Sequence, residues 1–173
     1  VCTSSRAEGT LGRRVRRSAR RETCMLLKEE LVRVGLDAHD GEEALRKVAQ
    51  GFVDAGYAKD SYPQAIVDRE AVFPTALPAV AFDIAIPHCD PTHINEPAVS
   101  IVTLREPVEL KMMGDPDTTL RPRVLFMLAL EAHGQVEMLR RLMEVIQDQR
   151  LLEAIGACAN AHELYVLMAE KIG

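Results

Sequence analysis

No run of apolar residues in this 173-residue chain approaches the roughly 18 that a membrane-spanning helix needs. The first residues also lack the apolar centre of a secretory signal peptide. Four cysteines stand at positions 2, 24, 89 and 158 without a Cys-x-x-Cys pair, so the sequence indicates neither a zinc knuckle nor a disulfide framework. These absences predict a soluble, cytoplasmic protein with reduced thiols and with no metal or other cofactor.

The composition is that of one ordinary globular domain, with 47% hydrophobic and 27% charged residues. Residues 1–24 hold seven arginines against two glutamates, which gives +5 and leaves −10 for the rest of a chain whose net charge is −5. The run from Arg13 to Arg17 is able to bind nucleic acid or an anionic membrane, but the segment has almost no apolar periodicity. We therefore expect residues 1–24 to be a basic, disordered tail or over-extended translation, residues 25–173 to form the domain, and nucleic acid not to be a partner.

From residue 25 onward, strand and helix patterns alternate. Residues 31–36 predict a strand, and Asp40 with Glu43 predicts a capped helix that ends at Gly56. Ser61 predicts the cap of a second helix, which runs toward Arg69 and Glu70. Three further strands are predicted at residues 84–86, 98–104 and 124–130, with a turn at 114–117.

The C-terminal part predicts helices. An apolar stripe at Val136, Leu139, Leu142, Met143 and Ile146 has helical spacing, a short helix follows from residue 151, and Asn160 caps a last helix. Strands that alternate with helices predict a three-layer α/β domain, with a central mixed sheet flanked by helices on both faces.

The stretch from Asp83 to Asp90 is the most informative for function. The apolar residues 84–86 read as a buried strand, and Pro87 ends the pairing because it has no N–H to donate. His88 is therefore placed at a strand end, where histidine can act as a neutral nucleophile near pH 7. A lone histidine is also often structural, and the residues around it decide between these interpretations.

Those surroundings resemble the fructose/mannitol class of phosphotransferase-system EIIA domains. Asp83 to His88 resembles the Gly-Ile-Ala-Ile-Pro-His motif of that family, and Arg69-Glu70 followed by Phe73-Pro74-Thr75 resembles its upstream segment. The galactitol-type branch is the most similar over four segments, and the likeness as a whole extends from about Leu31 to Ile172. The four segments are Pro87-His88-Cys89-Asp90, His93-Ile94-Asn95, Met112-Met113-Gly114 and Gln135-Val136-Glu137-Met138-Leu139.

The resemblance implies a phosphoryl carrier. Such domains accept a phosphoryl group from the phosphocarrier protein HPr on one histidine, here His88, and pass it to a cysteine of EIIB, which serves the membrane permease EIIC. Phosphoryl transfer needs an in-line nucleophile and cationic or hydrogen-bonding groups around the phosphoryl oxygens. Arg69 would be such a cation, unless it forms a surface ion pair with Glu70 or Asp68. One nitrogen of His88 would have to be held protonated, for example by a backbone carbonyl, so that the other points outward.

The sequence departs from the family pattern at a few positions. Many members carry a second histidine at the head of the helix after the last strand, where Gln135 aligns and His133 lies two residues earlier. Either side chain is a candidate to bind the phosphoryl group or to be a simple loop or cap residue. Asp83 replaces a glycine and adds negative charge to the motif, and Ala76 also stands where glycine is common.

Two other functions fit the same residues. His88, Cys89, Asp90 and His93 are ligand types that suit zinc or iron, although their spacing matches no standard motif. The second alternative is a regulatory EIIA-like module that a partner protein recognises and that takes no part in transport. A Cys89–His88 nucleophilic pair is disfavoured because sequence neighbours at a strand end point in opposite directions.

Overall fold

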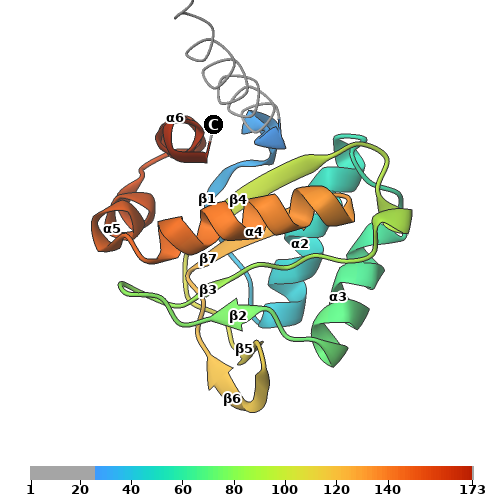
Figure 1. The fold of residues 1–173 in the computed structure, drawn as a ribbon, viewed down its shortest axis with the longest axis horizontal. Helices are drawn as coiled ribbons and strands as arrows, with labels where there is room; N and C mark the ends of the chain where they lie inside the picture. Colours follow the sequence, from blue (N-terminus) through green and yellow to red (C-terminus); the bar gives the residue numbers. More distant parts are fainter. Residues whose placement is uncertain (1–25, 173) are drawn as a thin grey trace, which may run out of the picture.

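The computed structural model describes residues 26–172, apart from the side chains of Ala132 and Glu170. The proposed basic tail, residues 1–24, lies outside the described residues. The described part folds as a mixed seven-stranded sheet with the strand order β1-β4-β7-β3-β2-β5-β6 (Figure 1). In chain order the elements are the 3₁₀ helix η1 (Glu29–Leu31), β1 (Arg33–Leu36), α2 (Gly41–Asp54), α3 (Tyr62–Val72), β2 (Ala76–Leu77), β3 (Ile84–Ala85), the 3₁₀ helix η2 (Pro91–His93), β4 (Ala98–Leu104), β5 (Leu110–Met112), β6 (Asp115–Leu120), β7 (Val124–Ala129), α4 (Ala132–Ile146), α5 (Gln149–Ala157) and α6 (Ala161–Ile172).

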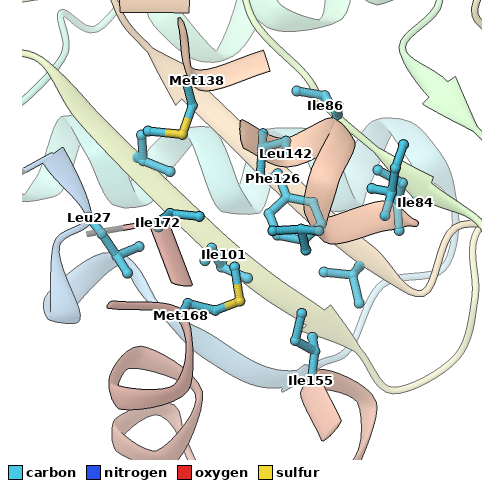
Figure 2. Close-up of a cluster of buried hydrophobic side chains, with 14 of the residues drawn as sticks. Leu27, Ile84, Ile86, Ile101, Phe126, Met138, Leu142, Ile155, Met168 and Ile172 are labelled. Atoms are coloured by element: carbon cyan, nitrogen blue, oxygen red, sulfur yellow. The ribbon is translucent and has the colours of Figure 1, made fainter. Parts of the chain in front are cut away.

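Helices cover both faces of this sheet, as the three-layer prediction requires. One apolar cluster lies between the sheet and α4, α5 and α6 (Figure 1). In Figure 2, Ile101 and Phe126 from the strands gather with Met138 and Leu142 from α4. A second cluster packs α2 and α3 on the opposite face. The central strands are therefore buried on both sides, which explains why residues 84–86 and 124–129 read as continuous apolar runs.

Helix starts were predicted well where a cap is local. The Asp40 side chain accepts the N–H of Glu43 at 2.8 Å, and Asn160 accepts the N–H of Glu163 at 3.0 Å. The Ser61 prediction was wrong in detail: α3 begins there, but the Ser61 side chain makes no cap hydrogen bond. Its hydroxyl instead lies 2.8 Å from Nδ1 of His93.

Two other predictions need correction. The turn lies at residues 113–114 and not at 114–117, because Asp115 already begins strand β6; Gly114 makes this tight turn with φ of +80°. That strand is at the edge of the sheet, which is where Pro116 is tolerated. The predicted stripe of α4 is also partly wrong. Val136 is 70% exposed and Met143 is 41% exposed, and the buried residues of this helix are Met138, Leu142, Val145 and Ile146.

No helix among residues 26–172 is long and apolar enough to cross a membrane.

Candidate active site at the end of strand β3

His88 lies where β3 leaves the centre of the sheet. Strand β3 runs between β2 and β7, and the pairing continues beyond its last residue. The N–H of Ile86 donates to the carbonyl of Thr75 at 3.1 Å, and the carbonyl of Pro87 accepts the N–H of Leu128 at 2.9 Å. Pro87 thus ends the pairing toward β2, as predicted, while β7 holds the chain for one residue more.

The backbone orients the His88 ring. Its Nδ1 lies 2.8 Å from the carbonyl oxygen of Ile86, two residues earlier. A carbonyl oxygen only accepts, so Nδ1 carries the proton and Nε2 carries the lone pair. The ring is partly exposed and lines a surface hollow of about 410 Å³. One ring nitrogen is therefore bonded to the backbone, and Nε2 belongs to a partly exposed ring at a strand end.

Arg69 lines the same hollow from the last turn of α3. Its guanidinium stacks on the ring of Phe73 with 4.1 Å between the guanidinium carbon and the ring centroid, and Nη1 donates to the Phe73 carbonyl at 3.3 Å. Among the described residues, no carboxylate is within ion-pair distance of Arg69, so the ion pair with Glu70 or Asp68 does not form. The structure brings a cation without a partner carboxylate to the hollow that holds His88.

Gln135 reaches the His88 segment from the other face of the sheet. Its Nε2 donates to the carbonyl of Leu130 at 2.8 Å and to that of Cys89 at 3.4 Å. His133 is exposed in the first turn of α4. Neither is among the described residues that line the 410 Å³ hollow, although Leu139 of the same helix is.

Cys89 is a buried thiol. It is 4% exposed, and its Sγ is 3.6 Å from the Asp90 carbonyl oxygen. Burial raises the pKa of Cys89 to about 12, so the thiolate is not formed near neutral pH. This agrees with the sequence argument against a Cys89–His88 nucleophilic pair.

The ligand types named for a metal site do not converge. His88 lines the hollow of about 410 Å³, whereas Cys89, Asp90 and His93 line an adjacent hollow of about 440 Å³, where Nδ1 of His93 lies 2.8 Å from the Ser61 hydroxyl. In the part of the chain that the structure describes, no group of three or more His, Cys, Asp or Glu residues is placed to hold a metal ion.

The family resemblance named Phe73 without a role, and the sequence did not predict that Val72 or Pro116 would line the site. Phe73 carries the stacked Arg69 and is 59% exposed, and Val72 beside it is 67% exposed. Met113 and Pro116 bring the β5–β6 hairpin to the rim of the hollow. Only the Met112-Met113-Gly114 segment of the family resemblance pointed to this hairpin.

Asp83 makes its hydrogen bonds at the other end of β3, away from His88. Its carboxylate accepts the N–H of Arg121 at 2.9 Å, and its carbonyl accepts the N–H of Arg123 at 2.9 Å. Both contacts are at the start of β3, five residues before His88. The negative charge that Asp83 adds to the motif therefore lies at the opposite end of β3 from His88.

Known proteins are similar to this chain in sequence and in fold. The galactitol-specific EIIA component of the phosphotransferase system of Escherichia coli (strain K12) is 27% identical over 124 residues, which are 72% of this chain and 83% of that protein. The crystal structure of the mannitol IIA protein from Escherichia coli superposes with a TM-score of 0.67 at 23% identity, and it covers 82% of this chain and 97% of its own. A complex of the mannitol enzyme IIA with phosphorylated enzyme IIB from Escherichia coli superposes with a TM-score of 0.68 at 23% identity. The match covers 84% of this chain and 99% of that chain.

The family model described as "Phosphoenolpyruvate-dependent sugar phosphotransferase system, EIIA 2" matches residues 25–171, which is most of the chain. The two structural likenesses, below 25% identity, add that the fold is the same. The chain therefore belongs to the EIIA 2 family of the phosphoenolpyruvate-dependent sugar phosphotransferase system, whose members are phosphotransferase components that carry phosphoryl groups.

Proposed function

We propose that this protein is a cytoplasmic phosphoryl carrier of a galactitol-like phosphotransferase system. It accepts a phosphoryl group from phospho-HPr on Nε2 of His88 and passes it to a cysteine of EIIB, which acts with the membrane permease EIIC. The observation that carries the proposal is the hydrogen bond from Nδ1 of His88 to the Ile86 carbonyl. It commits one nitrogen to the backbone and leaves the other as a nucleophile.

The transfer consists of two in-line displacements. In the first, the lone pair of Nε2 attacks phosphorus, the phosphorus–nitrogen bond of the donor histidine breaks, and its electron pair returns to the donor ring. In the second, an EIIB thiolate attacks, and the pair of the new phosphorus–nitrogen bond returns to Nε2. Nδ1 keeps its proton throughout, because the Ile86 carbonyl holds it.

Arg69 is proposed to bind the phosphoryl oxygens. Its present bond to the Phe73 carbonyl is long, 3.3 Å, and uses one of five N–H donors. The remaining donors are free to form a planar, charged fork on the phosphoryl group. Because a loose phosphoryl-transfer transition state spreads charge over three oxygens, such a fork stabilises it without a metal ion.

Gln135 and His133 are proposed as further phosphoryl-binding groups. The 3.4 Å bond from Gln135 to the Cys89 carbonyl is weak, and its N–H group is the one that can turn to a phosphoryl oxygen on the neighbouring His88. His133, exposed in the first turn of α4, would contribute as a donor or as a partial cation.

The rim of the hollow supports docking of protein partners. Val72 and Phe73 are exposed apolar side chains beside His88, and the acidic Asp68 and Asp90 line the adjacent hollow. A mixed surface of this kind suits a transient protein contact better than the binding of a small polar sugar.

The test is reconstitution from phosphoenolpyruvate, Enzyme I, HPr and this protein, followed by addition of EIIB. We expect acid-labile, base-stable label on this protein and its transfer to EIIB. No incorporation would contradict the carrier function. Label that forms but does not pass to any EIIB of the same organism would favour the regulatory module.

A further inference from the structure

Glu70 lies beside Arg69 in a place that local stability does not favour. It is in the last turn of α3, where the helix dipole is negative, and it is partly buried. Burial raises the pKa of this carboxyl, against the opposing effect of its hydrogen bonds to Thr75. A side chain that breaks a local rule at such a site often serves the site.

The carboxylate of Glu70 accepts hydrogen bonds from both donor groups of one buried residue, Thr75. Oε1 accepts the backbone N–H of Thr75 at 3.0 Å, and Oε2 accepts the Thr75 hydroxyl at 2.6 Å. Thr75 is 1% exposed, and it lines the same hollow as His88. Without Glu70, the N–H and the hydroxyl of Thr75 would be left in a buried place without these partners.

Thr75 in turn holds the backbone that orients the nucleophile. Its carbonyl accepts the N–H of Ile86 at 3.1 Å, just beyond the β2–β3 pairing, and the carbonyl of Ile86 accepts Nδ1–H of His88. Four residues are thus joined in series: Glu70, Thr75, Ile86 and His88. At Thr75 and at Ile86, the N–H and the C=O that take part belong to two different peptide groups. The series therefore fixes the position of His88, and we do not expect it to polarise the ring.

We propose that Glu70 is a positioning residue for phosphoryl transfer. It clamps the segment between α3 and β2, and through Thr75 and Ile86 it keeps the His88 ring in the orientation and tautomer that leave Nε2 outward. The expected effect of Glu70 on the rate of phosphoryl transfer rests on the proposed function. Its expected effect on the His88 tautomer is independent of that function.

The variants separate the hydrogen bonds from the charge. Glu70→Ala removes both bonds. Glu70→Gln keeps the shape, since its amide oxygen can accept from the Thr75 N–H and its amide nitrogen can donate to the hydroxyl. Thr75→Val and Thr75→Ser form a second pair, the first without and the second with the hydroxyl, in case Glu70→Ala does not fold. Glu109→Ala is the matched control, because Glu109 is an exposed carboxylate that lines the same 220 Å³ cavity as Glu70.

The first readout is nitrogen-15 NMR of the His88 ring in the unphosphorylated protein. We expect one tautomer, with Nδ1 protonated, in the unchanged protein and in Glu70→Gln, Thr75→Ser and Glu109→Ala. We expect a mixture of tautomers in Glu70→Ala and in Thr75→Val. A single unchanged tautomer in Glu70→Ala and Thr75→Val would overturn the proposal, whatever the activity.

The second readout is the transfer rate from phospho-HPr, separated into kcat and KM. We expect kcat of Glu70→Ala to fall roughly 10- to 100-fold with KM little changed, because misplacement of a nucleophile by about 1 Å has effects of this size. An equal fall of kcat in Glu70→Ala and Glu70→Gln would show that the charge of Glu70 matters and not its hydrogen bonds to Thr75. That result would also overturn the proposal. If the unchanged protein accepts no phosphoryl group, the proposed function fails while the tautomer experiment still decides on Glu70.

Discussion

The two ends of strand β3 differ in how their polar groups are used. At the first end, the Asp83 carboxylate accepts the N–H of Arg121 and the Asp83 carbonyl accepts the N–H of Arg123. Both of these polar groups are therefore bonded within the chain. At the second end, His88 has one nitrogen bonded to Ile86, and the rest of its ring faces a hollow that Arg69 also lines. The same strand therefore has one end whose polar groups bond within the chain and one end at which His88 and Arg69 line an open hollow.

This difference fits the role proposed for His88, that of a nucleophile. The N–H of Ile86 is bonded to Thr75 on one side and the carbonyl of Pro87 is bonded to Leu128 of β7 on the other, so the backbone just before His88 is held from two sides. The proline removes the next donor and lets the chain turn out of the sheet. His88 thus combines a fixed backbone with a partly exposed ring, and that combination is what in-line attack requires.

The largest effect short of removing the nucleophile is expected at Arg69. Arg69→Ala should lower the rate of transfer from phospho-HPr by about 10²–10³-fold, since a positioned charged donor stabilises the transition state by that order. Arg69→Lys should recover part of this, because a point charge replaces the planar fork. Single-turnover kinetics measure both variants. Equal rates for Arg69→Ala and the unchanged protein would mean that the stacking on Phe73 is the whole role of Arg69.

A smaller effect is expected at the start of α4. Gln135→Ala and His133→Ala should each slow transfer without eliminating it, by about tenfold or less, which is the value of a single hydrogen bond. The same single-turnover assay gives the rates, and thermal unfolding controls for the fold. Complete loss of transfer in the His133→Ala protein would indicate that His133 of α4, and not His88, accepts the phosphoryl group. The contrast between the two ends of β3 would then not explain the site.

The smallest effect on transfer is expected at the Asp83 end of β3. Asp83→Ala should leave the transfer rate unchanged and lower stability by about 1 kcal/mol, since one hydrogen bond to Arg121 is lost. For a chain of this size that corresponds to a melting temperature lower by about 2–4 °C. Asp83→Asn, which keeps an acceptor oxygen, is the matched control. A transfer rate reduced as strongly as in Arg69→Ala would show that the two ends are coupled.

Much of the fold was predictable because its signals are local. The caps at Asp40 and Asn160 involve residues three apart, and the apolar runs of β4 and β7 reflect burial on both faces. The hairpin of β5 and β6 was not predicted. Its second strand is exposed along most of its length and contains Pro116, so it has neither alternation nor an apolar run.

The candidate site was predictable in part for the same reason. The proline before His88 and the Ile86 carbonyl are sequence neighbours, so the anchored ring could be anticipated. Contacts that depend on the tertiary fold could not be. The hydroxyl of Ser61 was assigned to a helix cap but lies against His93, 32 residues later. The clamp of Glu70 on Thr75 has no sequence signature, since its purpose appears only when Thr75 meets Ile86 across two strands.

The most direct test of the central claim is to locate the phosphoryl group on the protein. The phosphorylated chain is mapped by peptides at neutral or alkaline pH, and nitrogen-15 NMR identifies the modified ring nitrogen. We expect one phosphoryl group on Nε2 of His88, with Nδ1 still protonated, and no label in the His88→Ala protein. A group on Nδ1 of His88, or stable label on His133 in the His88→Ala protein, would contradict it.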